Sequence, residues 1–151
     1  MTPPRRYAEG TVVPAAKTRG EIETFLTKQG ATSFGILTEQ TMFAVQFKVG
    51  ARVVRFVIGR ATLDTRLART APNRAIKERD AEERRRWRAL LLVLKAKFEA
   101  VASGITTFDH EFLAHLVTAG GVTVGDAIAP SLDRALAGEG APLALPPARG
   151  S

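Results

Sequence analysis

Two histidines and a large excess of arginines are the residues of this chain whose chemistry could carry a function. His110 and His115 stand five positions apart in the segment HEFLAH, and the sequence has no other histidine. At about 100° per residue, five helical steps place two side chains roughly 140° apart. The metalloprotease pattern needs histidines four positions apart, so that one helix aims both at one metal. The sequence therefore predicts no metal at either histidine, and Glu111 is a candidate to pair with His115.

Nucleophilic and nucleotide-dependent catalysis lack their usual motifs in this sequence. The chain has no cysteine, no G-x-S-x-G segment, no P-loop and no G-x-G-x-x-G segment. Asp109 and Glu111 are two positions apart, so one helix cannot turn both carboxylates towards the same reacting atom. The missing cysteines also exclude disulfides and thiolate metal sites. We therefore expect a protein that is not an enzyme and needs no cofactor.

Arginines set the charge of the sequence. The formal net charge is +7. Such a balance allows nucleic acid, acidic proteins or anionic surfaces as partners and selects none of them. If the partner is nucleic acid, phosphate contacts are expected from the arginines of the predicted strands, of the segment after them and of the following helix. These candidates are Arg52, Arg55, Arg60, Arg66, Arg69, Arg84, Arg85 and Arg88.

The run RRRWR at residues 84–88 has two interpretations. Arg84, Arg88 and Lys95 follow steps of four and seven residues, so they share one side of a helix and could form an anion-binding face. Alternatively, the run belongs to a solvated helix face that is stabilised by ion pairs with the acid first, Asp80–Arg84 and Glu82–Arg86. The sequence leaves both interpretations open.

One long helix, predicted over residues 73–103, organises the rest of the chain. Apolar residues recur there at steps of three and four, which is the pattern of an amphipathic helix. They are Trp87, Leu90, Leu91, Leu94, Phe98 and Val101. Asn73 is the expected N-cap, and Gly104 is the expected stop. Residues 89–94 are apolar nearly all round, so they need cover on more than one side.

Residues 33–59 predict an antiparallel three-stranded sheet. Gly50-Ala51 suits a two-residue hairpin with glycine first. That turn pairs Phe47 with Val54, Val45 with Phe56, and Phe43 with Ile58 on one buried face. A tight turn at Glu39-Gln40 would pair Ile36 with Phe43 and Phe34 with Val45, although these are poor turn residues and the loop could be wider. The strand phenylalanines all fall on the buried face, which argues against a base-stacking platform on the open one.

The remaining segments complete an α+β domain. Residues 1–17 are expected to form an extended arm, and residues 19–29 a short helix. Residues 60–72 show no clear period and are expected to form a mobile basic loop. Two C-terminal helices should follow, capped near Thr107 and Thr123, the second kinked or restarted at Pro130. The predicted organisation is thus one domain over residues 18–138, consisting of a short helix, a β-meander, the long helix packed on the sheet and two C-terminal helices, and a flexible tail at residues 139–151.

Four blocks of the chain carry a resemblance to a known family. They are RRYAEGTVVPAAKTRGEIETFLTKQGATSFGI, VVRFVIG, RRRWRALLLVLKAKFEAVASGITTFDHEFLAHLV and GVTVGDAIAP. Together they resemble a family of small uncharacterised proteins of proteobacterial phages and prophages, over most of residues 5–136. The resemblance implies a phage-type cytoplasmic setting, and it implies no activity and no catalytic residues.

Two functional hypotheses follow from these features. The first is a non-enzymatic phage-type accessory protein that binds DNA or RNA through phosphate contacts. The second is a protein-interaction factor that oligomerises or modulates a host or phage protein, and its motivation is the apolar segment 89–94. No apolar run approaches the length of a membrane span, so neither hypothesis involves a membrane.

Overall fold

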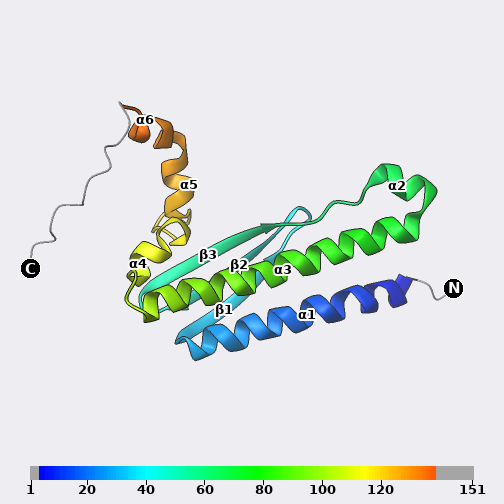
Figure 1. Ribbon diagram of the computed structural model, residues 1–151, viewed down its shortest axis with the longest axis horizontal. Helices are drawn as coiled ribbons and strands as arrows, with labels where there is room; N and C mark the ends of the chain where they lie inside the picture. The colour runs from blue at the N-terminus through cyan, green and yellow to red at the C-terminus, as the bar shows by residue number, and fades with distance from the viewer. Residues whose placement is uncertain (1–3, 139–151) are drawn as a thin grey trace, which may run out of the picture.

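Two long helices lie side by side over one face of a three-stranded sheet (Figure 1). The computed structural model describes residues 4–138, and the side chains of residues 15–138. The helices are α1 (Pro4–Lys28) and α3 (Pro72–Ala102), and the strands are β1 (Ala31–Thr38), β2 (Met42–Val49) and β3 (Arg52–Gly59). This arrangement confirms the predicted α+β fold with a long central helix packed on a meander. The tail predicted at residues 139–151 lies outside the described residues.

The β2–β3 hairpin has the predicted register. Phe47 pairs with Val54, Val45 with Phe56, and Phe43 with Ile58. Gly50 has a φ of +58°, a conformation that glycine adopts without steric cost, whereas Ala51 keeps a negative φ. The order of the strands in the sheet is β1-β2-β3.

The β1–β2 hairpin turns one residue later than a turn at Glu39-Gln40 would. Ile36 pairs with Val45 rather than with Phe43, and Phe34 pairs with Phe47 rather than with Val45. Glu39 donates its backbone N–H to the carbonyl of Met42 at 2.8 Å, which moves the loop to Gln40-Thr41. This register differs from the expected one by two residues on β2. A two-residue shift keeps every side chain on the same face of the sheet, so the residues predicted to face the core still do so.

The core lies between the sheet and the two helices. Of the strand residues predicted to share one face, those of β2 and β3 are buried except Ile58, which is partly buried, as are Phe34 and Ile36 of β1. α1 contributes Ile22 and Leu26, and α3 contributes its apolar stripe. The buried core residues are Ile22, Leu26, Phe43, Val45, Phe47, Val54, Phe56, Trp87, Leu90, Leu91, Leu94, Phe98 and Phe112.

The boundaries of α3 agree with the sequence at its end and differ at its start. The helix stops at Ala102, and Gly104 follows with a φ of +73°, as its role of stop residue requires. At the other end the N-cap is Ala71 and not Asn73, because Pro72 occupies the first turn, where its missing N–H costs nothing. In the apolar segment 89–94, the side chain of Leu92 is 61% exposed and that of Val93 41%.

The prediction of an extended arm at residues 1–17 was wrong for residues 4–17, which belong to α1. This helix begins at Pro4 and continues through Gly10 and Pro14, both of which weaken an isolated helix. α1 runs alongside α3 in Figure 1, and its Ile22 and Leu26 are fully buried. The buried residues of α1 thus lie in the part predicted as a helix, and residues 4–17 continue that helix towards the N-terminus.

The prediction of a mobile loop at residues 60–72 was also wrong in part. Residues 65–70 form the short helix α2 (Thr65–Thr70), and the Asp64 side chain caps it by accepting a hydrogen bond from the backbone N–H of Leu67 at 3.0 Å. α2 packs against the first turns of α3. The segment is therefore an ordered helical connection between β3 and α3.

The C-terminal region passes from the core face of the sheet, around the edge of β3, to the open face. It contains α4 (Phe108–Glu111), the 3₁₀ turn η1 (Leu113–His115), α5 (Val124–Ile128), the 3₁₀ turn η2 (Ala129–Ser131) and α6 (Leu132–Leu136). The predicted caps Thr107 and Thr123 both accept a backbone N–H. Leu116 forms a bridge with Val54 at the β3 edge. The two predicted helices are thus a series of short turns, with a restart at Pro130.

None of the helices in the described part of the chain is long and apolar enough to cross a membrane.

Candidate nucleic-acid interface

The two candidate arginines of β3 are engaged within the chain. Arg52 donates two hydrogen bonds to the carboxylate of Asp109, at 2.8 and 2.9 Å. These bonds raise the pKa of Arg52 and lower the pKa of Asp109. Arg55 donates to Gln46 at 3.1 Å and to the carbonyl of Gly121 at 2.8 Å, which ties the open sheet face to the C-terminal region. A phosphate would have to compete with these acceptors.

Arg60 and Arg85 also have partners within the chain. Arg60 donates to Glu83 at 3.0 Å and to the carbonyl of Glu39 at 3.3 Å. Its guanidinium lies 4.7 Å from the centre of the Phe43 ring. Arg85 is paired with Glu82. Both guanidinium groups therefore stabilise their surroundings in the folded chain.

Arg66 and Arg69 lie on α2. Both side chains are exposed. Neither makes a hydrogen bond or an ion pair with the part of the chain that the structure describes. α2 lies at the end of α3 that is farthest from α4 (Figure 1), so these two arginines form a separate cluster near the start of the long helix.

Arg84 and Arg88 are not neutralised by the carboxylates around them. The expected pair Asp80–Arg84 does not form, because Asp80 accepts a hydrogen bond from Arg79 at 3.2 Å. The expected pair Glu82–Arg86 forms, at 3.2 Å. Arg84 and Arg88 make no ion pair within the described residues. The two interpretations of the arginine run therefore apply to different residues. Arg85 and Arg86 are ion-paired, as on a solvated helix face, whereas Arg84 and Arg88 have no ion pair in the described chain and suit an anion-binding face.

A groove of about 530 Å³ runs between α1 and α3 beside these arginines. Lys17 and Lys28 of α1 and Lys95 of α3 line it, together with Leu91, Phe25 and the carboxylate of Glu21. Arg84 and Arg88 lie on the same side of α3 as Lys95, by the steps of four and seven residues. We call the five side chains Lys17, Lys28, Arg84, Arg88 and Lys95 the basic surface.

The basic surface has the dimensions of a nucleic-acid backbone contact. Arg84 and Lys95 are eleven residues apart on α3, as are Lys17 and Lys28 on α1, so each row extends about 16 Å. One strand of duplex DNA carries a phosphate about every 3.4 Å along the axis, so each row faces about five phosphates. Within the described chain none of the five cations is ion-paired. The groove therefore combines positive charge with the length that a backbone contact needs.

The lysines of α1 were not among the residues predicted from the sequence. Lys17, Glu21, Thr24 and Lys28 follow steps of four, three and four, and these steps place them on one face of a helix. That signal was present, but the helix was expected to begin only at residue 19. The packing of α1 on α3 decides which face of α1 lies beside Arg84 and Arg88. This long-range contact cannot be predicted from either segment alone.

Arg19 lies on a different side of α1 and packs inwards. Its guanidinium lies 4.7 Å from the centre of the Trp87 ring and 4.9 Å from that of Phe43. Burial lowers the pKa of Arg19, and the Nε atom is buried without an acceptor in the described residues. Arg19 therefore belongs to the aromatic packing beneath α1 and not to the basic surface.

The two histidines point to different environments. The His115 ring stacks on Phe56 with 3.9 Å between the ring centres, and burial there, together with the charge of Lys97, lowers its pKa. His110 is exposed. Glu111 accepts a hydrogen bond from Lys97 at 3.3 Å. Among the described residues no group of three or more His, Asp or Glu side chains is placed to hold a metal ion.

No protein-family model, no curated protein and no solved structure matches this chain. The resemblance to proteobacterial phage proteins stays a prediction.

Proposed function

We propose that the protein binds nucleic acid, without catalysis, by docking the phosphate backbone on the basic surface of α1 and α3. The observation that carries the proposal is a groove lined by Lys17, Lys28 and Lys95, with Arg84 and Arg88 on the same side of α3 by their spacing, and none of the five has an ion-pair partner in the described chain. Nucleic-acid phosphates suit such rows of cations, because each contact releases a condensed counterion.

The chemistry of this surface suits binding to the backbone rather than to the bases. The open face of the sheet presents no aromatic side chain on which bases could stack, because the strand phenylalanines pack into the core. Lysine and arginine contacts to phosphate fix the position of a protein on nucleic acid and carry no sequence information. We therefore propose binding with little sequence preference, as suits a phage-type accessory protein acting in the cytoplasm.

The eight predicted arginines are expected to contribute unequally to this binding. Arg84 and Arg88 lie at its centre, and Lys17, Lys28 and Lys95 join them. Arg66 and Arg69 are placed to extend the contact at the far end of α3. The other four already donate to acceptors within the chain, so they are expected to contribute less to binding. They are Arg52, Arg55, Arg60 and Arg85.

The test is fluorescence anisotropy with labelled single- and double-stranded DNA and RNA at several salt concentrations. Five contacts to duplex DNA predict a slope of log affinity against log salt of about −4.5, at roughly −0.9 per contact. Between 50 and 200 mM salt the affinity should then fall about 500-fold. The variant Arg84→Gln/Arg88→Gln/Lys95→Gln keeps two contacts, so its slope should be about −1.8 and its loss about 12-fold.

A matched control separates a local contact from the effect of net charge. Lys48→Gln/Arg74→Gln/Arg134→Gln removes the same three charges from exposed positions outside the basic surface. This control should keep the steep slope. If no nucleic acid binds even at about 50 mM salt, where phosphate contacts are strongest, the proposal fails. Equal slopes for the two triple variants would also reject the basic surface as the site.

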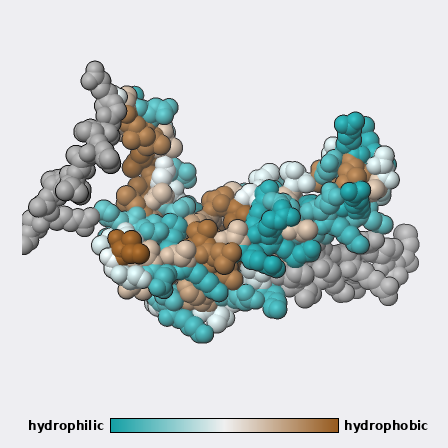
Figure 2. Space-filling view, viewed as in Figure 1, coloured by the Kyte–Doolittle hydropathy of each residue, from teal (hydrophilic) through white to brown (hydrophobic). Residues whose placement is uncertain are grey.

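A protein partner is the second candidate function, and the exposed apolar ridge of α3 favours it. Leu92 and Val93 lie on the side of α3 that faces away from the sheet. In Figure 2 apolar residues lie over part of the C-terminal half of α3, among hydrophilic ones. A ridge of this kind is typical of a protein contact. The second hypothesis gains weight if a Leu92→Glu variant loses a partner while its nucleic-acid affinity stays unchanged.

A further inference from the structure

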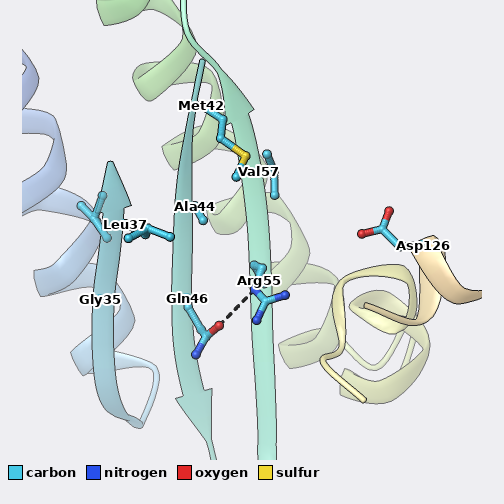
Figure 3. A pocket seen from close by; sticks show the side chains of 9 residues that line it. Gly35, Leu37, Met42, Ala44, Gln46, Arg55, Val57 and Asp126 are labelled. Atoms are coloured by element: carbon cyan, nitrogen blue, oxygen red, sulfur yellow. Dashed lines mark hydrogen bonds between the residues drawn. The ribbon is translucent and has the colours of Figure 1, made fainter. Parts of the chain in front are cut away.

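The open face of the sheet carries an apolar groove of about 750 Å³ (Figure 3). Its floor is formed by Leu37, Met42, Ala44 and Val57. The side chains of Leu37 and Val57 are more than half exposed, at 57% and 56%. The hydrogen-bonded pair Gln46–Arg55 lies at one end. A groove of this volume, with an apolar floor and a few polar groups, has the usual form of a binding site.

The segment 124–136, which we call the arm, presents a second uncovered apolar surface. It comprises α5, η2 and α6, and no residue of these elements is buried. Three large apolar residues of the arm are exposed, namely Ile128 at 46%, Leu132 at 45% and Leu136 at 74%. The arm stands away from the body of the molecule in Figure 1, and Figure 2 shows apolar residues along it.

The arm cannot fill the groove of its own chain. Asp126, at the start of α5, already lies at the wall of the groove, and the rest of the arm leads away from it. This direction is fixed at three points. Thr123 caps α5, Arg55 holds the carbonyl of Gly121, and Gly125 lies so close to Ala114 that a Cβ at residue 125 would come within 2.9 Å of the Ala114 carbonyl oxygen.

A second copy of the chain is the occupant that fits, because it brings an exposed apolar arm to the apolar groove. A chain with a net charge of +7 repels its own copies over most orientations. The groove and the arm are close to neutral, because Arg55 is offset by Asp126, and Arg134 by Asp133. The basic surface lies on the helices that cover the opposite face of the sheet. The open face is therefore the side on which two copies can approach with the least repulsion.

We propose that the protein forms a two-fold dimer in which the arm of each copy lies in the sheet groove of the other. The exposed Ile128, Leu132 and Leu136 then cover the floor at Leu37 and Val57, and one assembly closes both apolar surfaces on each copy. The proposal is independent of nucleic-acid binding, since it uses the opposite face of the sheet.

The test measures the mass of the protein in solution by sedimentation and light scattering. The wild-type protein should be a dimer. Val57→Glu damages the groove and Leu132→Glu damages the arm, so each should raise the dimer dissociation constant by about tenfold or more. Ile105→Glu is the matched control, because Ile105 is 81% exposed but lies outside the groove and the arm, and it should leave the dimer unchanged.

Mixing the two damaging variants gives a result that only arm exchange predicts. A pair made of one Val57→Glu copy and one Leu132→Glu copy keeps one intact arm and one intact groove in contact. The mixture should therefore form more dimer than either variant alone.

Single cysteines supply a second measurement that does not depend on weakening the dimer. The native chain has no cysteine. A Val57→Cys copy and a Leu132→Cys copy should cross-link to each other under oxidising conditions, whereas Ile105→Cys should cross-link with neither. A monomeric wild-type protein, a mixture that shows no recovery, or the absence of this specific cross-link would overturn the proposal. Rings or filaments in place of dimers would overturn its two-fold closure.

Discussion

Replacing Phe56 by alanine should remove a large part of the stability of the fold. The ring is 7% exposed, stacks on His115 and meets Phe112 edge-on with 6.4 Å between ring centres. Phe56 thus joins the sheet to the C-terminal region. Truncating a buried phenylalanine costs about 3–5 kcal/mol, and the two ring contacts favour the upper half of that range. For a chain of this size the melting temperature should fall by about 2–4 °C per kcal/mol, which for about 4–5 kcal/mol is roughly 8–20 °C.

Urea titration of dilute protein, followed by tryptophan fluorescence, measures this cost. Trp87 is the only tryptophan in the sequence and is 1% exposed, so its emission reports the packing of α3 on the sheet. Val57→Ala is the matched control, because Val57 is the next residue on β3 and lies on the open face. Its cost should stay below about 0.5 kcal/mol. Equal costs at the two positions, or a larger cost at Val57, would refute the assigned faces of the sheet.

Three further expectations concern local chemistry. The fold lowers the pKa of His115, so the free energy of unfolding should have its full value above the unfolded pKa of about 6.5 and should fall as the pH drops below it. In pH-dependent urea titrations, His115→Gln should flatten this fall. The variant His110→Gln, at an exposed position, should keep it. Gly125→Ala should cost about 1–3 kcal/mol and displace α5, since its Cβ meets a backbone oxygen, and limited proteolysis should detect the loosened arm. Gly50→Ala should cost about 1–2 kcal/mol in thermal unfolding, because φ is +58° there.

The faces of the sheet could be predicted from the sequence because a strand has a side-chain period of two. The β2–β3 register followed from Gly50, whose position in a two-residue turn leaves one pairing. The β1–β2 register did not follow, since Glu39 and Gln40 carry no turn preference and the loop moved by one position. The apolar stripe of α3 was equally predictable, because it repeats over four turns and ends at a glycine.

The helical state of residues 4–17 could not be predicted from local signals. Gly10, Pro14 and the valines between them favour extended or irregular structure when read alone. The helix forms as part of α1, which packs along α3, a segment more than fifty residues away. α2 was missed for a smaller reason. Asp64 is a good N-cap, but the six residues after it are too few to show a helical period.

Of the two rows of the basic surface, the row on α3 was predictable from the sequence, and the row on α1 was not. The spacing of Arg84, Arg88 and Lys95 places them on one side of α3. Whether Arg84 and Arg88 form an ion pair depends on which cation each neighbouring carboxylate binds. Asp80 binds Arg79, and Glu82 binds both Arg85 and Arg86. Several cations lie within reach of each carboxylate on a helix, so sequence spacing alone does not decide the pairing.

The positions of the two proposed surfaces on opposite sides of the sheet determine how they would work together. The basic surface lies on α1 and α3, which cover one face, and the groove and the arm lie on the other. A two-fold dimer closed through the open faces carries its two basic surfaces outwards, pointing away from each other. Such a dimer cannot place both surfaces on one side of a single duplex, as helix-turn-helix dimers do. Each copy would hold its own stretch of backbone, and the dimer would bring two segments of nucleic acid together.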